Sequence, residues 1–408
     1  MTEEAGTLAR AEPAALRAAT DDRRPVRVLH CVGHLARGGI ESWLYQMVQR
    51  LDALRFRHDV IVWTEEEEAF TAQFRAAGVG VRPVAGHGDP RRLRREIARI
   101  VRDHGPYDLL HTHGSHGHAF VMLFAALAGI RARVAHSHTD VRPVLRGAGP
   151  GYRLYAAAGN GLMRRLATAG VGVTGEAAES LFGTRWRDDR RLRVVHCGVD
   201  LAPFAREPDP ELRAKLGIPP DRPVVGHVGR FEAQKNHAFL LDIAEELARR
   251  GSPLHFLLIG DGSLRPGFTG EMARRGLEGS FTIVADCLTV PEHMISAMDC
   301  FICPSLYEGL PLVAVEAQAA GLACLVSEGT SREIRLHDPL VERMALERGA
   351  AAWAEAIERM PARRVDNRDP ALRRSVEGSS FNVETSAAGL AAVYDDAVAT
   401  AAGRGRTA

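Results

Sequence analysis

The sequence has little of what marks nucleic-acid-binding, exported or membrane-spanning proteins. Its 52 Lys and Arg are balanced by 51 Asp and Glu, which argues against nucleic-acid binding as the main task. The longest apolar run, residues 119–130, is too short to cross a bilayer and fits a helix packed on a sheet. The first residues are acidic and lack the apolar segment of a secretion signal. We therefore expect a cytoplasmic protein without a nucleic-acid partner, with the inner face of the membrane as the alternative location.

Cysteine is also scarce. Six cysteines are scattered through the 408 residues, mostly in apolar segments, which favours free buried thiols in a reducing compartment. Cys300 and Cys303 have a Cys-x-x-Cys spacing, but on a strand they point to opposite faces, and no second pair completes a zinc site. The sequence therefore predicts no disulfide framework and no metal at these positions.

Short apolar strands that alternate with helical patterns are abundant. One series of strands begins at Val26 and ends near residue 195, and a second runs from Val224 to Val326. The strands of the second series are expected at Val224–Val228, His255–Ile259, Phe281–Val284, Cys300–Cys303 and Ala323–Val326. The chain is too long for a single core, and such alternation predicts parallel sheets with helices on both faces. The expected fold class is α/β, with two doubly wound, Rossmann-like domains that face each other across a ligand cleft.

We divide the chain into four segments. Residues 1–25 are expected to be a flexible polar tail, residues 26–200 the first domain, residues 201–378 the second domain, and residues 379–402 a C-terminal helix. After residue 330 the strand pattern fades, and only helices are expected there.

Residues 304–326 organise the second domain. An apolar strand leads into a loop, and a helix is expected from Gly309, with Pro311 in its first turn and Gly321 as its end. Such corners at the carboxyl ends of parallel strands bind anions, because a helix N-terminus offers free N–H groups and a partial positive charge.

Two glutamates flank this corner. Glu308 and Glu316 are expected ~12 Å apart, too far to share a proton but suited to hold a long ligand at a sugar and at a ribose. The alternative is that Glu308 caps the helix and Glu316 faces solvent. The apolar neighbours of Glu316 argue against a solvated face.

Two further loops carry groups that suit phosphates. Arg230 and Lys235 follow the first strand of the second domain, where two fixed positive charges would bind a diphosphate. The alternative is an ordinary charged surface loop. Gly38 and Gly39 follow the first strand of the first domain and allow backbone N–H groups to approach a phosphate or sugar, although such pairs are common at turns.

Histidine is dense at residues 111–118 and 136–138. Four histidines in eight residues suggest a metal, but the run continues through a glycine loop without fixed ligand geometry. Polar loop residues that line the cleft are the preferred interpretation. His138, at the carboxyl edge of its strand, is better placed to touch a substrate hydroxyl, with a structural histidine as the alternative.

Together these segments resemble one family. The motifs are Arg-Gly-Gly-Ile-Glu at 37–41, Ala-His-Ser-His-Thr at 135–139, Val-Gly-Arg-Phe-Glu-Ala-Gln-Lys-Asn-His at 228–237, Leu-Ile-Gly-Asp-Gly at 258–262 and Glu-Gly-Leu-Pro-Leu-Val-Ala-Val-Glu at 308–316. They resemble the retaining GT-B glycosyltransferases of the bacterial exopolysaccharide and capsule type (glycosyl transferases group 1), in the same order over residues 26–400. One departure is Ser-Glu-Gly-Thr-Ser-Arg-Glu-Ile at 327–334, where many relatives have glycines before Pro-Glu.

The resemblance implies a hexosyltransferase that moves a sugar from a nucleotide sugar, most commonly a UDP-sugar, to a hydroxyl of a lipid-linked glycan or small molecule with retention. It implies no essential metal or other cofactor, and a final helix that packs back on the acceptor-side first domain. The resemblance also implies a role for each candidate residue. Arg230 and Lys235 would bind the diphosphate of the sugar donor, Glu316 would bind its ribose, and Glu308, Gly309 and Leu310 would contact the transferred sugar. Gly38 and Gly39 would approach the donor closely, and His138 would contact the sugar near the reacting carbon.

Other functions stay open. A nucleotide-sugar epimerase can share this architecture but needs an acid/base pair, which His138 alone does not supply. A catalytically silent sugar-nucleotide-binding partner is a further alternative, against which the intact Arg230, Lys235, Glu308 and Glu316 weigh. The basic run at residues 91–100 leaves peripheral membrane contact open, with a solvated helix face preferred.

Overall fold

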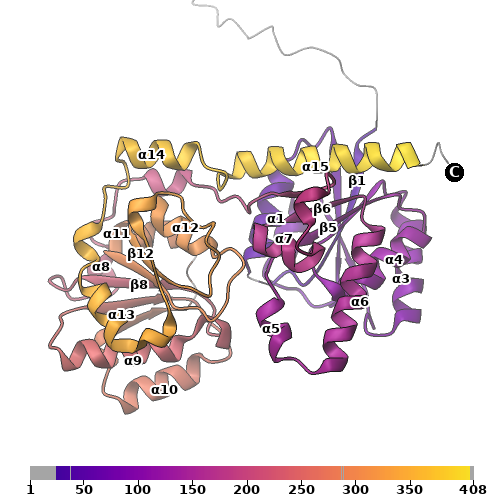
Figure 1. The fold of residues 1–408 in the computed structure, drawn as a ribbon. Coiled ribbons are helices and arrows are strands. Elements are labelled where there is room, and N and C mark those ends of the chain that lie inside the picture. Colours follow the sequence, from indigo (N-terminus) through magenta and orange to yellow (C-terminus); the bar gives the residue numbers. More distant parts are fainter. Residues whose placement is uncertain (1–23, 37, 286, 288, 405–408) are drawn as a thin grey trace, which may run out of the picture.

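The protein folds into two α/β domains that lie side by side (Figure 1). The computed structural model describes residues 24–36, 38–285, 287 and 289–404. The tail expected at residues 1–25 therefore lies almost wholly outside the described residues. None of the helices in the described part of the chain is both long enough and apolar enough to cross a membrane.

The first domain is built on a parallel sheet with seven described strands in the order β3-β2-β1-β4-β5-β6-β7. These strands are β1 (Val26–Gly33), β2 (Phe56–Val62), β3 (Gly80–Pro83), β4 (Leu109–Thr112), β5 (Ala132–Ser137), β6 (Ala169–Gly172) and β7 (Leu192–Val194). Because β1 pairs with β2 on one side and β4 on the other, the strand order reverses beside β1. In open α/β sheets, ligands bind at the carboxyl ends of the strands near such a point.

Helices cover both faces of this sheet. They are α1 (Gly39–Arg50), α2 (Thr71–Ala76), α3 (Pro90–His104), α4 (Ala119–Leu127), α5 (Arg142–Gly147), α6 (Pro150–Leu166) and α7 (Gly175–Phe182). Trp43 of α1 belongs to the core on one face, and Ile97 of α3 and Met163 of α6 belong to the core on the other. The arginines of the predicted basic run face solvent on α3, while its apolar positions are buried.

The second domain has a parallel sheet with six described strands in the order β10-β9-β8-β11-β12-β13. They are β8 (Val224–Val228), β9 (His255–Ile259), β10 (Phe281–Val284), β11 (Cys300–Cys303), β12 (Ala323–Ser327) and β13 (Val341–Met344). The expectation that strands end by residue 330 is wrong, because β13 pairs in parallel with β12. Glu342 and Arg343 interrupt its apolar pattern, which an edge strand open to solvent tolerates.

The helices of the second domain surround one continuous core. They are α8 (Leu212–Lys215), α9 (His237–Arg249), α10 (Arg265–Arg274), α11 (Val290–Ala297), α12 (Leu312–Ala319), α13 (Gly349–Glu358) and α14 (Pro370–Glu377).

The last helix, α15 (Val383–Arg404), returns to the first domain, along which it lies in Figure 1. The Trp43 indole N–H donates to the Ser386 hydroxyl at 3.0 Å, and this hydroxyl donates to the His196 carbonyl oxygen at 2.8 Å. Leu390 and Tyr394 of α15 are fully buried. The described part of the chain thus begins with β1 and ends with α15, both in the first domain, and the second domain lies between them in sequence.

Candidate functional site

Two loops of the second domain are tied together at the carboxyl ends of neighbouring strands. β8 pairs with β11, so the loop after β8 (residues 229–236) lies beside the loop after β11. The Gln234 amide donates to the Tyr307 carbonyl oxygen at 2.9 Å. Asn236, in the left-handed region with φ of 56°, donates to the Pro304 carbonyl oxygen at 3.2 Å. These bonds hold the side chains of both loops in fixed relative positions.

Lys235 and Glu308 form an ion pair with each other. Lys235 Nζ is 2.5 Å from Glu308 Oε1, and the same oxygen accepts from the Ser305 hydroxyl at 3.0 Å. The side chains are only 18% and 11% exposed. Burial alone would lower the pKa of the Lys235 ammonium, but the Glu308 carboxylate outweighs burial and the pKa is raised. Lys235 is therefore charged at neutral pH and held in place.

Arg230 adds a positive charge that this ion pair does not neutralise. Its side chain is exposed and has no ion-pair partner within the described residues. Its charge acts to lower the pKa of Lys235 in the second domain and of Glu41 in the first. A charge felt by both groups lies at the boundary between the domains. The loop therefore offers one unpaired guanidinium to an anion at this boundary.

The helix after Glu308 begins later than its sequence predicts. α12 starts at Leu312 with Pro311 as its N-cap, so the expected start at Gly309 is wrong. Proline disfavours the helical conformation in the residue before it, and Gly309 and Leu310 accordingly belong to the loop. Their N–H groups are loop groups that precede the N-terminus of the helix.

Glu316 lies in the second turn of α12 and is half-buried. Burial raises its pKa to about 7. No hydrogen bond to its carboxyl group comes from the described residues. Because a buried carboxylate without donors is costly, Glu316 is a group that ligand hydroxyls would satisfy.

Gly39, the first residue of α1, faces the second domain, and Gly38 is the N-cap of this helix. A side chain at Gly39 would lie 4.0 Å from Leu312 Cδ1 of α12, and one at Gly38 would collide with the Glu41 carboxylate. Burial raises the pKa of Glu41, which lies in the first turn of α1. No role was predicted for Glu41, although its place in the Arg-Gly-Gly-Ile-Glu motif was a signal.

His138 contacts the second domain through its backbone. It directly follows β5, and any side chain at Gly309 would collide with the His138 carbonyl oxygen and with Thr139 Cα. Glycine at position 309 thus allows the loop of one domain to touch the strand end of the other. The His138 ring is half-buried, and burial lowers its pKa to about 3. The ring is therefore neutral at physiological pH.

His111 and His113 do not line the boundary, so the prediction of polar loop residues is wrong for these two histidines. His111 and His113 are buried on the sheet face that α1 and α15 cover. His111 Nδ1 lies 2.8 Å from the Tyr394 hydroxyl, and Trp43 packs edge-on against His113. Residues two apart on a strand share a face, which places both rings in the core.

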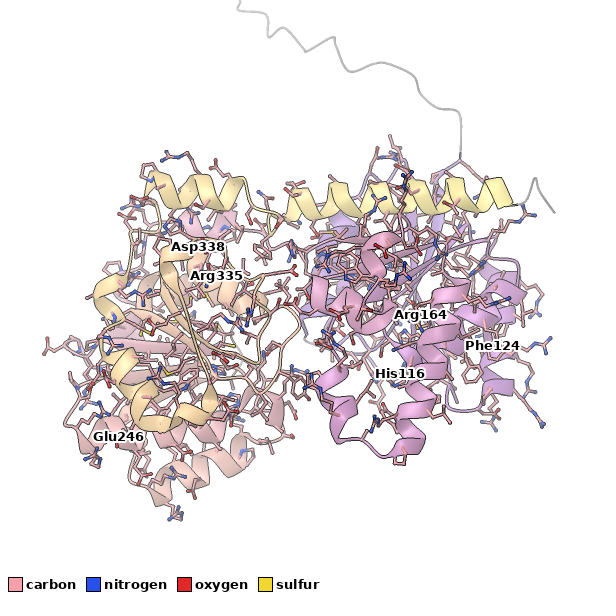
Figure 2. The ribbon with its side chains drawn as sticks, in the orientation of Figure 1. His116, Phe124, Arg164, Glu246, Arg335 and Asp338 are labelled. Atoms are coloured by element: carbon pink, nitrogen blue, oxygen red, sulfur yellow. The ribbon has the colours of Figure 1, made fainter. Side chains whose placement is uncertain are left out.

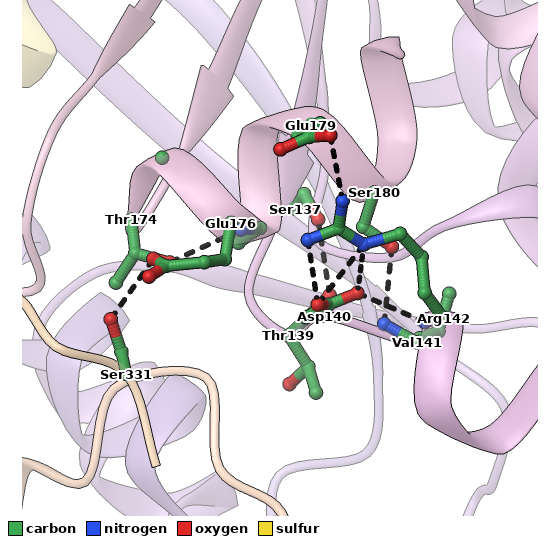
Figure 3. A network of polar contacts seen from close by, with 12 residues as sticks. Ser137, Thr139, Asp140, Val141, Arg142, Thr174, Glu176, Glu179, Ser180 and Ser331 are labelled. Atoms are coloured by element: carbon green, nitrogen blue, oxygen red, sulfur yellow. Dashed lines mark hydrogen bonds and ion pairs between the residues drawn. The ribbon is translucent and has the colours of Figure 1, made fainter. Parts of the chain in front are cut away.

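Two residues without a predicted role join the domains. Glu333 Oε1 accepts from the Gly175 N–H at the start of α7 at 2.7 Å, and Glu333 Oε2 is 2.9 Å from His196 Nε2. The Ser331 hydroxyl donates to the Glu176 carboxylate at 3.0 Å (Figure 3). Both residues lie in the segment whose sequence departs from the commoner pattern, and this departure was the available signal.

Two groups of buried histidines have nitrogen atoms close enough to share a cation. The groups are His30, His111, His113 and His113, His136, His138, with one nitrogen from each ring within 4.8 Å of the others. Nitrogen atoms of these rings also pair with one another at 3.0 and 3.1 Å, which is hydrogen-bond geometry. Among the residues predicted to bind the sugar donor, Arg230 and Lys235 offer positive charges, which suit an anionic diphosphate.

Two cavities lie away from these residues. One of about 200 Å³ is lined by residues that include Arg164 and Asp189, and one of about 330 Å³ by residues that include Pro203 and Glu292. None of the predicted site residues lines either cavity. The contact between Gly309 and His138, and the charge of Arg230 that acts on groups of both domains, place the candidate site at the domain boundary instead.

Comparison with known proteins identifies the family. Residues 37–203 match the model of Glycosyltransferase Family 4, and residues 208–368 match that of Glycosyl transferases group 1. The chain is 32% identical over 341 residues to a putative glycosyltransferase EpsF of Bacillus subtilis (strain 168), covering 82% of this chain and 88% of the relative. The chain belongs to the glycosyltransferases.

This glycosyltransferase shares its fold with solved structures. It superposes on Anabaena Alr3699/HepE in complex with UDP and glucose with a TM-score of 0.74 and 18% identity, over 91% of this chain and 99% of the other. It is also 27% identical over 231 residues to the UDP-Gal:alpha-D-GlcNAc-diphosphoundecaprenol alpha-1,3-galactosyltransferase of Escherichia coli, covering 54% of this chain and 58% of the relative. The predicted GT-B fold is confirmed, and the epimerase alternative is not favoured.

Proposed function

We propose that this glycosyltransferase transfers a hexosyl unit from a UDP-sugar to a hydroxyl acceptor with retention, in polysaccharide or glycoconjugate biosynthesis in the cytoplasm. The observation that carries the proposal is the convergence of Arg230 and the Lys235–Glu308 ion pair beside the contact between Gly309 and His138. The complex of Alr3699/HepE with UDP and glucose and the UDP-Gal specificity in the galactosyltransferase's name support a UDP-sugar donor.

In this proposal the cationic groups bind the donor diphosphate. Arg230 is free to swing onto the phosphates, whereas Lys235 is a fixed charge held by Glu308. As the bond to the sugar breaks, negative charge grows on the leaving UDP, and preorganised positive charges stabilise it. The side chains supply the charge that a metal ion supplies in other transferases, so the proposal includes no metal or other cofactor.

The sugar and ribose would be held on either side of the diphosphate. Glu308 uses Oε1 for Lys235 and Ser305, and Oε2 is left for a sugar hydroxyl, as no described residue bonds to it. The partnerless carboxyl group of Glu316 would accept from the ribose hydroxyls. The further donor contacts proposed are backbone contacts of Gly38, Gly39, Gly309 and Leu310.

In this proposal the acceptor hydroxyl attacks the anomeric carbon from the same face that the donor phosphate leaves, so the anomeric configuration is retained. The acceptor oxygen bonds to the anomeric carbon as the carbon–phosphate oxygen bond breaks, and the acceptor proton passes to the departing phosphate. Asp140, two residues beyond His138, is occupied by Arg142, whose Nε and Nη2 lie 2.9 and 2.8 Å from its oxygens (Figure 3). Its carboxylate is therefore poorly suited as a nucleophile, and a trapped glycosyl ester of any Asp or Glu would contradict this step.

We propose that the acceptor is a lipid-linked glycan and that the protein binds it at the surface of an anionic membrane. Residues 141–166, which form α5 and α6, contain five arginines and no acidic residue. The α5–α6 surface also exposes Val144, Tyr152, Leu154 and Tyr155, by 45% to 72%. His116, labelled beside α6 in Figure 2, fixes the position of one of these side chains, because its Nε2 lies 3.1 Å from the Tyr152 hydroxyl. Exposed aromatic and aliphatic groups among arginines suit the interface of an anionic bilayer.

The donor assignment is tested by calorimetry and product analysis. Arg230→Ala should weaken UDP binding by roughly tenfold or more, because a charge-assisted hydrogen bond contributes ~1.5–3 kcal/mol. Arg249→Ala, which removes an exposed arginine on α9 paired with Glu246, should leave the affinity unchanged. NMR of the product should show the anomeric configuration of the donor, with turnover unaffected by EDTA. Equal UDP affinity in wild type and Arg230→Ala, or an inverted product, would reject the proposal.

A further inference from the structure

A chain of hydrogen-bonded imidazoles runs through the core of the first domain to His138. His58 Nδ1 is 3.0 Å from His30 Nε2, and His30 Nδ1 is 3.0 Å from His113 Nε2. His113 Nδ1 is in turn 3.1 Å from His138 Nε2. The first three rings are buried and only His138 is half-buried, so the chain connects the interior of the sheet with the domain boundary.

Each ring of this chain is neutral. Burial lowers the pKa of His58 to about 4 and that of His138 to about 3, and it lowers the pKa of His30 and His113 well below the ordinary value. A neutral imidazole has one N–H donor and one bare nitrogen acceptor. Every link in the chain therefore needs one donor and one acceptor, and a ring that accepts on one side must donate on the other.

This requirement couples the tautomers. Every link joins the Nδ1 of one ring to the Nε2 of the next. If His58 donates through Nδ1, His30 accepts at Nε2 and must itself donate through Nδ1. The same reasoning passes through His113 to His138. The four rings are thus all protonated at Nδ1 or all protonated at Nε2.

The ends of the chain select between these two states. His58 Nε2 is buried and has no partner among the described residues. A buried N–H without an acceptor is rarer in proteins than a buried acceptor without a donor, which favours a bare Nε2 on His58 and hence Nδ1–H on all four rings. At the other end, His138 Nδ1 is 3.8 Å from Cys197 Sγ, a long contact to a weak acceptor. The Nδ1–H of His138 therefore has no strong acceptor among the described residues.

We propose that His58, His30 and His113 are positioning residues that hold His138 in the Nδ1–H tautomer, so that it donates a hydrogen bond to a hydroxyl oxygen of the bound sugar. The hydrogen bond from His138 to a sugar rests on the proposed function, whereas the coupling of the tautomers does not depend on that function. In the opposite tautomer His138 would offer a lone pair at Nδ1, and a sugar hydroxyl would have to turn its proton toward the ring.

NMR of full-length protein with 15N-labelled histidine rings tests the chain directly. Long-range proton–nitrogen correlations distinguish Nδ1–H from Nε2–H, and the signals are assigned by loss in His138→Gln and His113→Gln. We expect Nδ1–H on His138 and on His113 in the wild type. Opposite tautomers on these two rings, or Nε2–H on His138, would overturn the proposal, and this spectrum needs no variant at His58.

A matched pair of variants tests the coupling over the length of the chain. In His58→Asp, measured well above neutral pH so that the buried carboxyl group is ionised, the carboxylate at the place of Nδ1 only accepts, so His30 must donate through Nε2 and His138 should change to Nε2–H. His58→Asn has the same shape and retains an N–H donor, so it should keep the wild-type tautomer. Transfer kcat should be at least about tenfold lower in His58→Asp than in His58→Asn, with a smaller change in KM. A folded His58→Asp with His138 still protonated at Nδ1 would overturn the proposal.

Two other outcomes distinguish this proposal from a metal site and from the proposed function. One equivalent of Zn²⁺ in the purified protein, lost in His113→Gln, would show that the cluster is a metal site and would overturn the hydrogen-bonded chain. Coupled tautomers in a protein that transfers no sugar from any UDP-sugar would support the chain and reject the proposed function instead.

Discussion

Burial determines how the charged residues of the site pair and which of their pKa values shift. Lys235 and Glu308 neutralise each other inside the second domain, while Arg230 stays free at the surface. Glu316 has neither a cationic partner nor a hydrogen-bond donor among the described residues, and burial raises its pKa from 4.5 to about 7. The fold thus holds a carboxyl group whose ionisation costs stability in the absence of a ligand.

Glu316→Gln should stabilise the protein above neutral pH. Because the pKa of Glu316 in the folded state is raised, folding loses stability as pH rises from about 4.5 through about 7. The glutamine variant lacks this loss, so its free energy of unfolding should exceed that of the wild type by about 3 kcal/mol at about pH 8 and match it at about pH 4. Urea denaturation at both pH values measures this. Glu355→Gln, on the exposed face of α13, is the control, and a difference independent of pH would contradict the prediction.

At the scale of elements, the hairpin of α5 and α6 differs from the helices around it. α3 buries its apolar positions and leaves arginines in solvent, whereas α6 exposes tyrosine and leucine together with arginine. Leu154 is 72% exposed. An isolated exposed apolar residue is ordinary, but several on one charged hairpin indicate a contact surface.

Removal of two apolar groups should weaken membrane binding of the hairpin. We expect Leu154→Ser with Tyr155→Ser to lower the binding constant for phosphatidylglycerol vesicles, measured by sedimentation, by about a hundredfold or more, since each buried apolar side chain contributes ~1.5–3 kcal/mol. Phosphatidylcholine vesicles should bind the wild type weakly, because arginines need anionic lipid. Leu54→Ser, at an 81% exposed leucine outside the hairpin, is the control. Equal sedimentation of wild type and double variant would reject the lipid surface.

At the scale of the molecule, Glu333 links the two domains. Burial alone would raise its pKa, but hydrogen bonds from His196 and the Gly175 N–H outweigh burial and lower it. The lowered pKa means that the contact stabilises the paired domains above the ordinary carboxyl range and is lost as pH falls through the lowered pKa. Domain pairing should therefore loosen in acid.

Glu333→Ala should loosen the pairing at neutral pH as well. Without its carboxylate the Gly175 N–H and His196 lose their partner, so we expect a larger radius of gyration by small-angle X-ray scattering and faster proteolysis between the domains. Glu342→Ala removes an ion pair to Arg363 within the second domain and should leave the radius unchanged. Identical scattering for Glu333→Ala and the wild type would show that other contacts hold the domains.

How well the bounds of a strand or helix could be predicted depended on how deeply it is buried and on how it begins. Val224–Val228, His255–Ile259 and Cys300–Cys303 have the predicted bounds, because buried parallel strands are continuous apolar runs. Val341–Met344 was missed because an edge strand admits charged residues. The start of α12 was misplaced because Pro311 was taken to lie inside the helix rather than to cap it.

By itself the sequence determined the order of strands and helices, the two-domain GT-B architecture and the set of cationic and acidic groups at strand ends, since these depend on local apolar pattern and on motifs. Only the tertiary structure decided which groups neutralise each other, as Lys235 and Glu308 do, and which remain free, as Arg230 does. It also decided that His58 of β2, His30 of β1, His113 just after β4 and His138 just after β5 form one hydrogen-bonded chain. Such pairings join residues distant in sequence, and their charge states depend on burial that no local pattern contains.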